Sequence, residues 1–353
     1  MGSAAAQKEG QRQAATPVQP WLQRRDIMVA GLILAFGLIG FCLSEKRWPA
    51  WARWFADRRL ARAAKLSEEE RRTVEVIVDR NKGDWIESHF RKRWLQHKYL
   101  SWIEILACYQ PWGWRPRPVL IGQQYLDDAL ADGRGVVLLT ANFAYKDLMT
   151  KAALAKAGRL ACHLKRDSHG FAESVLGKRL LNPIQSRIER RFLRDTLVFS
   201  GDQTAYVNPL IRTRLRQNQM LFVTVTPLGR RVSLLPFLHG RIRIATGALK
   251  FACESGAKVL PIFTIRQPDG RVDIIIEPAL RGQHEESYAA AIQSMLEDYV
   301  PRLEGYVAQY PDQFTFPLSS QYGEALIEPS AGFPAESEAD SGLLRDGVVS
   351  ETV

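Results

Sequence analysis

The pattern of hydrophobic and polar positions divides the chain into three parts. The first contains a run of seventeen residues without a charge, Ile27 to Leu43. The second has helical periodicity and predicts helices over 68–80 and 85–108. Ser67 and Glu70 form a capping box that marks where the first of these helices begins. In the third part, short apolar runs alternate with amphipathic segments, which indicates a different architecture.

The alternation in the third part predicts a layered α/β domain. Its short apolar runs are typical of buried strands, and the segments between them have the helical period. We predict strands over 135–140, 160–164, 196–200, 220–226, 259–265 and 272–276. We predict helices over 123–131, 146–157, 171–193, 206–216, 245–254 and 284–309, and a break near Pro183 is the alternative to one continuous helix over 171–193. The fold class is therefore α/β, with a mixed, mostly parallel sheet flanked by helices and an N-terminal transmembrane helix.

The apolar run 27–43 is predicted to be a membrane anchor. At about 1.5 Å per residue it spans roughly 26 Å, slightly less than a hydrocarbon core of about 30 Å. Seven Lys/Arg lie between residues 44 and 65 and four precede the run, so the positive-inside rule places the main body in the cytoplasm. A cleaved signal peptide and a buried core helix are the alternatives. A basic stretch, rather than an A-x-A cleavage motif, follows the run.

These patterns predict five regions along the chain. All nine tryptophans lie at or before Trp114, and several are interleaved with Lys and Arg, which suits the headgroup layer of a membrane. A solvated basic helix with partly buried tryptophans is the alternative. The regions are a disordered N-terminus (1–26), the anchor (27–43), a basic, Trp-rich, helical membrane-proximal region (44–118), the α/β domain (119–316) and an acidic disordered tail (317–353).

The net charge of +10 is unevenly distributed. Residues 321–353 hold seven acidic groups and one basic group, so this segment carries −6 and the remainder +16. A basic body indicates an anionic partner. A nucleic-acid binder would interleave basic and aromatic residues along its globular part, whereas here they adjoin the apolar run, so we expect a membrane lipid partner and no nucleic acid. Four dispersed cysteines without a CxxC pair argue against a zinc site or a disulfide framework.

The most informative segment runs from Gly133 to Asp147, with the sequence GRGVVLLTANFAYKD. It predicts a buried strand, polar Asn142 at the strand's carboxyl end and acidic Asp147 opening the next helix, and α/β sheets bind ligands at that end. The segment resembles the bacterial lipid A biosynthesis acyltransferases, within the lysophospholipid acyltransferase superfamily, in which such a strand is followed by His, four residues, and Asp or Glu. The resemblance covers roughly residues 50–315 and includes Leu235-Pro236-Phe237, Ala245-Thr246-Gly247, Pro268-Asp269-Gly270 and Ile276-Glu277-Pro278.

The resemblance implies transfer of a fatty acyl chain from acyl carrier protein or coenzyme A to a membrane lipid, with no cofactor besides this co-substrate and no metal. It also implies that a His deprotonates the acceptor hydroxyl while the carboxylate orients the imidazole. This chain has Asn142 in place of the His and retains the acidic position as Asp147. A carboxamide cannot accept that proton, and loss of a general base typically costs about 10²–10⁴ in rate. A second acidic position of the family is Thr224 here.

Several other residues are candidates for the same site. Lys165 and Arg166 match the region of an Arg that lines the family's site, and they are candidates for contacting a phosphate or an oxyanion. Arg241 lies in a predicted loop before a helix start with Thr246 and Gly247, where free N–H groups attract anions. Solvated basic turns are the alternative. Candidates for a substitute base are His163, His169 and His239.

Two functions are therefore considered for this chain. The first is an acyltransferase of the bacterial inner membrane, single-pass with a cytoplasmic body, whose catalytic centre is marked by Asn142 and Asp147. The second is a catalytically inactive member of the family that binds an acyl lipid or acyl carrier protein as an accessory or regulatory protein. The loss of both the motif His and the second acidic residue favours the second. The sequence leaves the acceptor, the acyl length, the donor and the oligomeric state open.

Overall fold

The centre of the protein is a mixed β-sheet. The computed structural model describes residues 20–63, 65–79, 85–111, 114–199, 204–282, 287–318 and 325–327. Within them, seven strands form a sheet in the order β1-β9-β8-β2-β5-β3-β4. Only the β8–β9 pair is antiparallel, so the predicted mixed, mostly parallel sheet is confirmed. The strands are β1 (Val119–Ile121), β2 (Val136–Thr140), β3 (Cys162–Arg166), β4 (Asp195–Phe199), β5 (Met220–Thr224), β8 (Lys258–Arg266) and β9 (Val272–Ile276).

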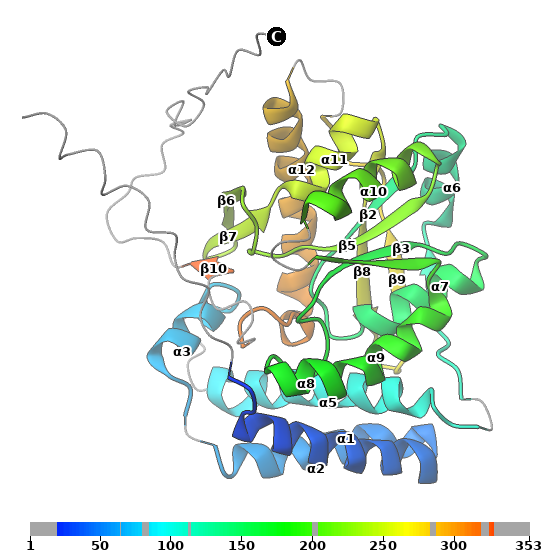
Figure 1. Ribbon diagram of the computed structural model, residues 1–353. Helices are drawn as coiled ribbons and strands as arrows, with labels where there is room; N and C mark the ends of the chain where they lie inside the picture. Colours follow the sequence, from blue (N-terminus) through cyan, green and yellow to red (C-terminus); the bar gives the residue numbers. More distant parts are fainter. Residues whose placement is uncertain are drawn as a thin grey trace, which may run out of the picture.

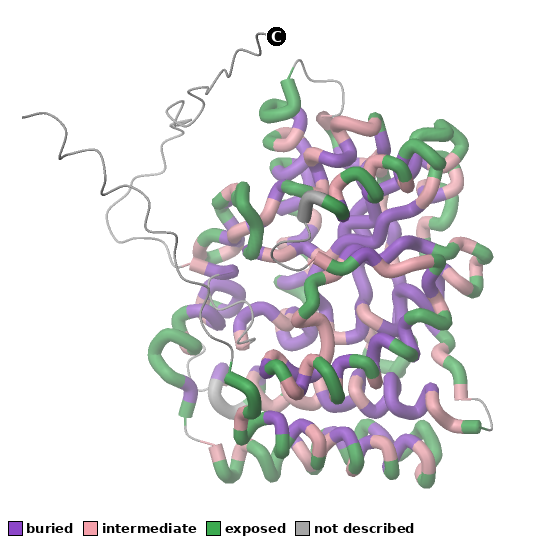
Figure 2. The backbone as a smooth tube through the Cα atoms, in the orientation of Figure 1, coloured by how far each residue is buried: buried purple, intermediate pink, exposed green. Residues whose placement is uncertain are grey.

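Helices cover both faces of this sheet (Figure 1). One face packs against α5 (Arg91–Ala107), α6 (Gln123–Ala131), α7 (Lys151–Lys156) and α9 (Asn182–Glu189), and α8 (Val175–Leu180) contacts α9. The other packs against α10 (Thr204–Arg216), α11 (Gly247–Ser255) and α12 (Tyr288–Gln309). Strand β2 is buried throughout, with Val136 and Leu138 in the first core and Val137 and Leu139 in the second. Figure 2 shows this buried centre, with exposed positions gathered on the outer helices.

An N-terminal layer of helices lies against α5. It comprises α1 (Arg24–Cys42), α2 (Trp48–Leu60) and α3 (Glu68–Glu75), the last with the predicted capping box. Helix α1 is long and apolar enough to cross a membrane by length and composition, with a mean hydropathy of 1.9. It packs one side against α5, which buries Phe36 and brings Gly40 so close that an added Cβ would lie 3.2 Å from the Ala107 backbone. The predicted apolar run is therefore a helix seated on the body of the protein.

The outward side of this layer is unusually apolar. Ile27, Leu34 and Leu38 of α1 each expose about two-thirds of their surface. On α2, Trp51 and Trp54 are also exposed, and the Arg58 guanidinium lies 4.5 Å from the centre of the Trp54 ring. Exposed apolar and aromatic side chains beside basic ones therefore gather on one outer surface, the α1–α2 face.

A second, three-stranded sheet corrects one prediction. It has the order β10-β7-β6, with β6 (Val232–Phe237), β7 (Gly240–Ala245) and β10 (Leu326–Ile327). The predicted loop position of Arg241 and the predicted helix start at residue 245 were wrong, because Arg241 lies on β7 and α11 begins at Gly247. Ile242 and Ile244 are buried while the intervening arginines are not. This period-two alternation indicates a strand.

Other elements differ from the predictions in their limits. The predicted helix 171–193 is divided just before Pro183 into α8 and α9, and the predicted helix 146–157 opens with a π-helical turn, η4 (Lys146–Thr150). Helix α1 begins inside the predicted disordered terminus, and β10 lies inside the predicted tail. The rest of those termini, 1–19 and 328–353, lies outside the described residues. Further short helical turns are η1 (Glu45–Arg47), η3 (Ile86–Phe90), η5 (Arg190–Phe192) and η7 (Pro311–Gln313).

Candidate active site

The carboxyl ends of β2, β3 and β5 meet at one edge of the sheet, as parallel neighbours must. Asn142 follows β2 at this edge and is 2% exposed. Its Nδ2 donates to the Val225 carbonyl at 2.7 Å, and its own carbonyl accepts from the backbone N–H and the hydroxyl of Thr315, both at 2.8 Å. The side chain thus ties β2 to the segment after β5, which is a structural role that needs no proton transfer.

Asp147 lies in the π-helical turn η4, five residues after Asn142. Its Oδ1 accepts from Lys146 Nζ at 2.7 Å, and Lys151 Nζ is 3.9 Å away. Burial on its own would raise the Asp147 pKa, but Lys146, His169 and Lys151 outweigh it, so the pKa lies below the usual value. The carboxylate is therefore ionised at neutral pH. In the described part of the chain, no hydrogen bond joins Asp147 to Asn142, so the two predicted residues share an edge without forming a dyad.

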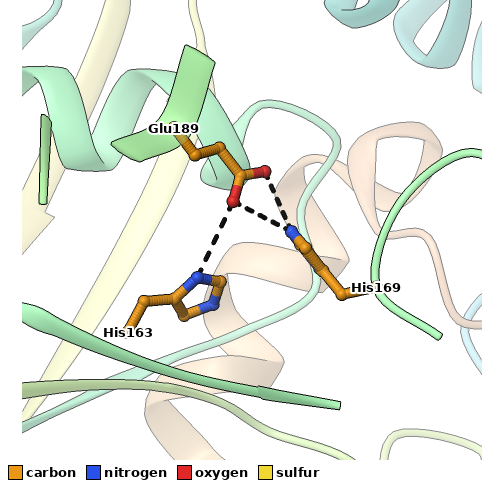
Figure 3. A group of neighbouring side chains, drawn as sticks. All are labelled: His163, His169 and Glu189. Atoms are coloured by element: carbon orange, nitrogen blue, oxygen red, sulfur yellow. Dashed lines mark hydrogen bonds and ion pairs between the residues drawn. The ribbon is translucent and has the colours of Figure 1, made fainter. Parts of the chain in front are cut away.

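Lys151 connects Asp147 to a second carboxylate, Glu189. Lys151 Nζ donates to Glu189 Oε2 at 2.9 Å, and both side chains are almost wholly buried. His169 Nε2 lies 2.9 and 3.0 Å from the two Glu189 oxygens, and His163 Nδ1 lies 3.7 Å from Oε2. Figure 3 shows both imidazoles facing this one carboxylate, His163 from β3 and His169 from the loop that follows. We call Asp147, Lys151, His163, His169 and Glu189 the charge network.

The buried members of the charge network have fixed protonation states. Burial alone would raise the Glu189 pKa, but His169 and the Lys151 ammonium hold it well below its usual range. Burial and then the Lys151 ammonium lower the His163 pKa well below that of a free imidazole, so His163 is neutral. Its Nδ1 has no hydrogen-bond partner among the described residues.

The charge network reaches the surface at two of its members. The Asp147 side chain is 23% exposed and that of His169 is 15% exposed. The Lys151, His163 and Glu189 side chains are at most 2% exposed. Asp147 and His169 are therefore the members open to solvent, and the other three lie shielded behind them.

Three members of the charge network also have the composition of a metal site. His163, His169 and Glu189 each offer one ligand atom, all within 4.8 Å of one another, and zinc accepts such ligands. The Lys151 ammonium already bonds to Glu189, however, so a divalent cation would lie beside a buried positive charge. The positive charges of Lys146 and Lys151 also neutralise the negative charges of Asp147 and Glu189. We therefore interpret the cluster as an ion-pair network and assign it no metal.

The predicted basic residues Lys165 and Arg166 end strand β3 and point to opposite faces of the sheet. Lys165 Nζ donates to Ser186 Oγ on α9 at 2.7 Å, on the side of the charge network, and burial lowers the Lys165 pKa. Arg166 is exposed, and its guanidinium lies 3.5 Å from the Leu228 carbonyl. The structure thus brings Lys165 to the charge network and leaves Arg166 on the other side of the strand.

The predicted anion site at the start of α11 belongs to the smaller sheet. Arg241 is exposed on β7, and Thr246 precedes Gly247, the first residue of α11. The backbone N–H of Thr246 donates to the Arg231 carbonyl at 3.1 Å, so part of the predicted anion-binding surface is already used. These residues are connected to the edge of the large sheet through Ala245, whose N–H donates to the Thr226 carbonyl at 2.8 Å. His239 is exposed on the turn between β6 and β7.

A cavity of about 830 Å³ lies between α1, α2, α3 and α5. Lys98 is central to it, since its ammonium lies 5.0 Å from the Trp94 ring and 5.6 Å from the Trp102 ring. Burial, together with Arg25 and Arg59, lowers the Lys98 pKa to about 8. The basic lining residues are Arg24, Arg25, Arg59, Arg91 and Lys98, and the acidic ones are Glu69 and Glu70. The apolar and aromatic ones include Met28, Val29, Leu32, Leu66, Trp94, Leu95, Tyr99, Trp102 and Leu318.

The lining of this cavity is connected to the candidate site in two places. Trp102 packs edge-on against Phe171 with ring centres 4.8 Å apart, and Phe171 follows His169 by two residues. Leu318 follows Thr315, which bonds the Asn142 carbonyl, by three residues. The cavity, Lys151 and Glu189 were not predicted from the sequence. Lys151 lies four residues after Asp147 on one helical face, a spacing that could have indicated an ion pair.

Comparison with known proteins places the chain in a family. Residues 65–318 match the family model of the bacterial lipid A biosynthesis acyltransferases, and the chain belongs to this family. The sequence-based resemblance is thereby confirmed. Among solved structures, the chain is similar to the crystal structure of the 1-acyl-sn-glycerophosphate (LPA) acyltransferase PlsC from Thermotoga maritima, at 13% identity and a TM-score of 0.34. That match covers 80% of this chain and 98% of the other. No curated protein sequence matches the chain.

Proposed function

We propose that this protein is a membrane-attached acyltransferase that moves a fatty acyl group from acyl carrier protein or coenzyme A to a membrane lipid of the lipid A or phospholipid type. Membership of an acyltransferase family supports the reaction class. The observation that carries the proposal of a lipid acceptor is the cavity, because its walls combine five basic and two acidic side chains with apolar and aromatic ones.

An anionic amphiphile needs both basic and apolar side chains in its binding site. Arg and Lys bind phosphate oxygens through charge-assisted hydrogen bonds, while apolar side chains stabilise a hydrocarbon chain by about 25 cal/mol per Å² buried. In the cavity, Arg25 and Arg59 outweigh Glu173 in their effect on Lys98 and help to lower its pKa, so these cations repel one another. An anionic headgroup would offset that repulsion, and Trp94 and Trp102 offer ring faces to the lipid beside it.

The α1–α2 face supports attachment to a membrane. Helix α1 packs along α5 and turns Ile27, Leu34 and Leu38 outward. Trp51 and Trp54 on α2, beside arginines, have the composition of a helix that lies in the headgroup layer. We propose that the protein lies on the cytoplasmic side of the bacterial inner membrane with this face in the bilayer surface. A single-pass crossing would require α1 to leave α5.

Acyl carrier protein is the proposed donor over coenzyme A. Carrier proteins of this class are strongly acidic, and the body of this chain, without residues 321–353, carries +16. Complementary charge accelerates encounter and orients the partners. Replacing acyl carrier protein with the coenzyme A thioester should therefore slow acyl transfer and weaken its dependence on ionic strength.

The alternative function is a non-catalytic lipid or carrier-protein binder. The observation that favours it is the side chain of Asn142, which is buried, bonds to Val225 and stands where the family has its base. The cavity and the α1–α2 face would serve such a binder equally well. Catalysis and binding must therefore be separated by experiment.

The decisive test is acyl transfer by the purified full-length protein in lipid vesicles, with radiolabelled acyl carrier protein or acyl coenzyme A as donor. Incorporation of label into lipid is expected for the wild type, and Asp147→Ala should reduce it at least tenfold. Lys98→Met should raise the KM for lipid, whereas the matched change of an exposed lysine, Lys156→Met, should not. If the wild type is inactive with both donors while Asn142→His gains activity, the protein is the non-catalytic binder.

A further inference from the structure

We propose that His169, held by Glu189, is the general base of this enzyme and supplies the imidazole that Asn142 lacks. The inference rests on the proposed acyltransferase function and names the residue that performs its proton transfer. It places the base on the loop after β3 instead of the loop after β2, across the same sheet edge.

The geometry around His169 is that of a carboxylate–imidazole pair. Its Nε2 lies 2.9 Å from Glu189 Oε1, and Gln185 Nε2 donates to the same oxygen at 2.6 Å. An ionised carboxylate only accepts hydrogen bonds, so the proton of neutral His169 resides on Nε2 and the lone pair on Nδ1. A carboxylate in this position fixes the tautomer and stabilises the imidazolium that forms when the base takes up a proton.

His163 does not fill this role, although it faces the same carboxylate. It is 1% exposed inside β3, and the Lys151 ammonium disfavours any charge on its ring. His169 is 15% exposed and interacts electrostatically with Asp147, the retained acidic position of the family motif. Of the two imidazoles, His169 is therefore the one that both a substrate and the acidic motif residue can reach.

The charges around His169 are balanced, and the Glu189 carboxylate among them lies against its ring. Glu189 and Gln185 from α9 are within hydrogen-bond distance of Nε2, and Asp147 from η4 and His163 from β3 interact with the ring electrostatically. The ammonium groups of Lys146 and Lys151 are paired with Asp147 and Glu189. Glu189 is therefore the charged group that contacts an imidazolium formed at His169 directly.

The proposed step is a direct acyl transfer. His169 Nδ1 takes the proton of the acceptor hydroxyl, and that oxygen attacks the thioester carbonyl carbon. A C–O bond forms and the C–S bond breaks, so the electron pair leaves with sulfur. The imidazolium then returns its proton to the leaving thiolate, which gives an ester and a free thiol, with His169 restored to its neutral form.

The test compares His169→Gln with His239→Gln, the same change at an exposed histidine on the β6–β7 turn. We expect His169→Gln to lower kcat by about 10²–10⁴ with little change in KM, the range for loss of a general base, and His239→Gln to leave both unchanged. The Lys151–Glu189 and Gln185–Glu189 bonds remain in His169→Gln, so the variant should fold, and its thermal unfolding should match that of the wild type.

Two further measurements distinguish a catalytic base from a structural residue. Added imidazole should restore part of kcat to His169→Gly but not to Asp147→Ala. The double change His169→Gln/Asn142→His should regain activity, because it places an imidazole at the family's own position before Asp147. If the wild type transfers acyl groups and His169→Gln retains its kcat, the base assignment is wrong while the proposed function stands. If the wild type is inactive with both donors, the proposed function itself fails.

Discussion

Replacing Lys151 with methionine tests whether the charge network stabilises the fold. Methionine keeps most of the apolar stem and removes the ammonium, which is 0% exposed and 2.9 Å from Glu189 Oε2. Removing one partner of a buried ion pair typically costs about 3–5 kcal/mol, because the other charge stays buried without compensation. His169 and Gln185 still bond to Glu189, so we expect the lower end, about 3 kcal/mol.

The effect has a defined pH dependence. The Glu189 pKa is held well below its usual range in the folded protein, so its ionisation stabilises the fold above the unfolded pKa of about 4.3. That contribution is lost as the pH falls through the folded pKa. The difference in stability between wild type and Lys151→Met should therefore be largest near neutral pH and shrink in acid, because a protonated Glu189 no longer needs the ammonium.

Thermal unfolding followed by near-UV circular dichroism measures this difference. With an unfolding entropy of about 2.1 cal/mol/K per residue, a fold of about 300 residues shifts by roughly 1.5 °C per kcal/mol, so the midpoint should fall by roughly 5 °C at pH 7. Lys156→Met, an exposed lysine on the same helix, is the matched control and should shift it by less than about 2 °C. The double change Lys151→Met/Glu189→Met should recover part of the loss. A Lys151→Met midpoint equal to that of Lys156→Met would refute the reasoning.

Three other predictions concern the cavity and the N-terminal helices. Because the Lys98 pKa is about 8, its charge is lost as the pH rises, so the affinity for a short-chain phosphatidic acid should fall severalfold between pH 7 and 9. Titration calorimetry measures this affinity. For Lys98→Met it should be weaker and should change less with pH. Gly40→Val should force α1 away from α5 and lower the thermal midpoint by several degrees, while Gly31→Val, with open space around it, should not. Trp51→Ser/Trp54→Ser should weaken binding to anionic vesicles at least tenfold in a flotation assay.

Each of these three predictions has an outcome that would contradict it. Phosphatidic acid affinity that is unchanged between pH 7 and 9 would mean that Lys98 does not contact the anion. Equal midpoints for the two glycine variants would contradict the close packing of α1 on α5. Leu210→Ser, at an exposed leucine of α10, is the control for vesicle binding, and an effect equal to that of the tryptophan pair would remove the α1–α2 face from the membrane contact.

The sequence predicted the parts of the fold that depend on local periodicity. Strand β2 and helix α6 were found nearly residue for residue, since continuous apolar runs and helical spacing are local properties. The strand alternation of β7 was overlooked because Thr246-Gly247 suggested a helix start two residues too early. Strand β1 is too short, at three residues, for a periodicity to be recognised.

The candidate site was predictable only in part, because its partners are distant in the chain. Asn142 and Asp147 follow one strand and were found from a local motif. Glu189 lies among arginines in a segment that reads as a solvated helix, yet folding buries it against Lys151, 38 residues earlier. The cavity could not be predicted at all, since α1 and α5 form its walls only after they pack together.

The position of α1 also determines where the folded unit begins. The family match starts at residue 65, so a truncation that removes residues 1–64 could be designed to remove only a membrane anchor. Helices α1 and α2, however, contribute Phe36 and Trp48 to the core beneath α5, and α1 forms one wall of the cavity. A protein shortened to residue 65 would therefore lose one wall of the cavity and expose α5 to solvent. The folded unit extends back to at least Arg24, and the helix that we propose attaches the protein to the membrane also forms part of the proposed lipid site.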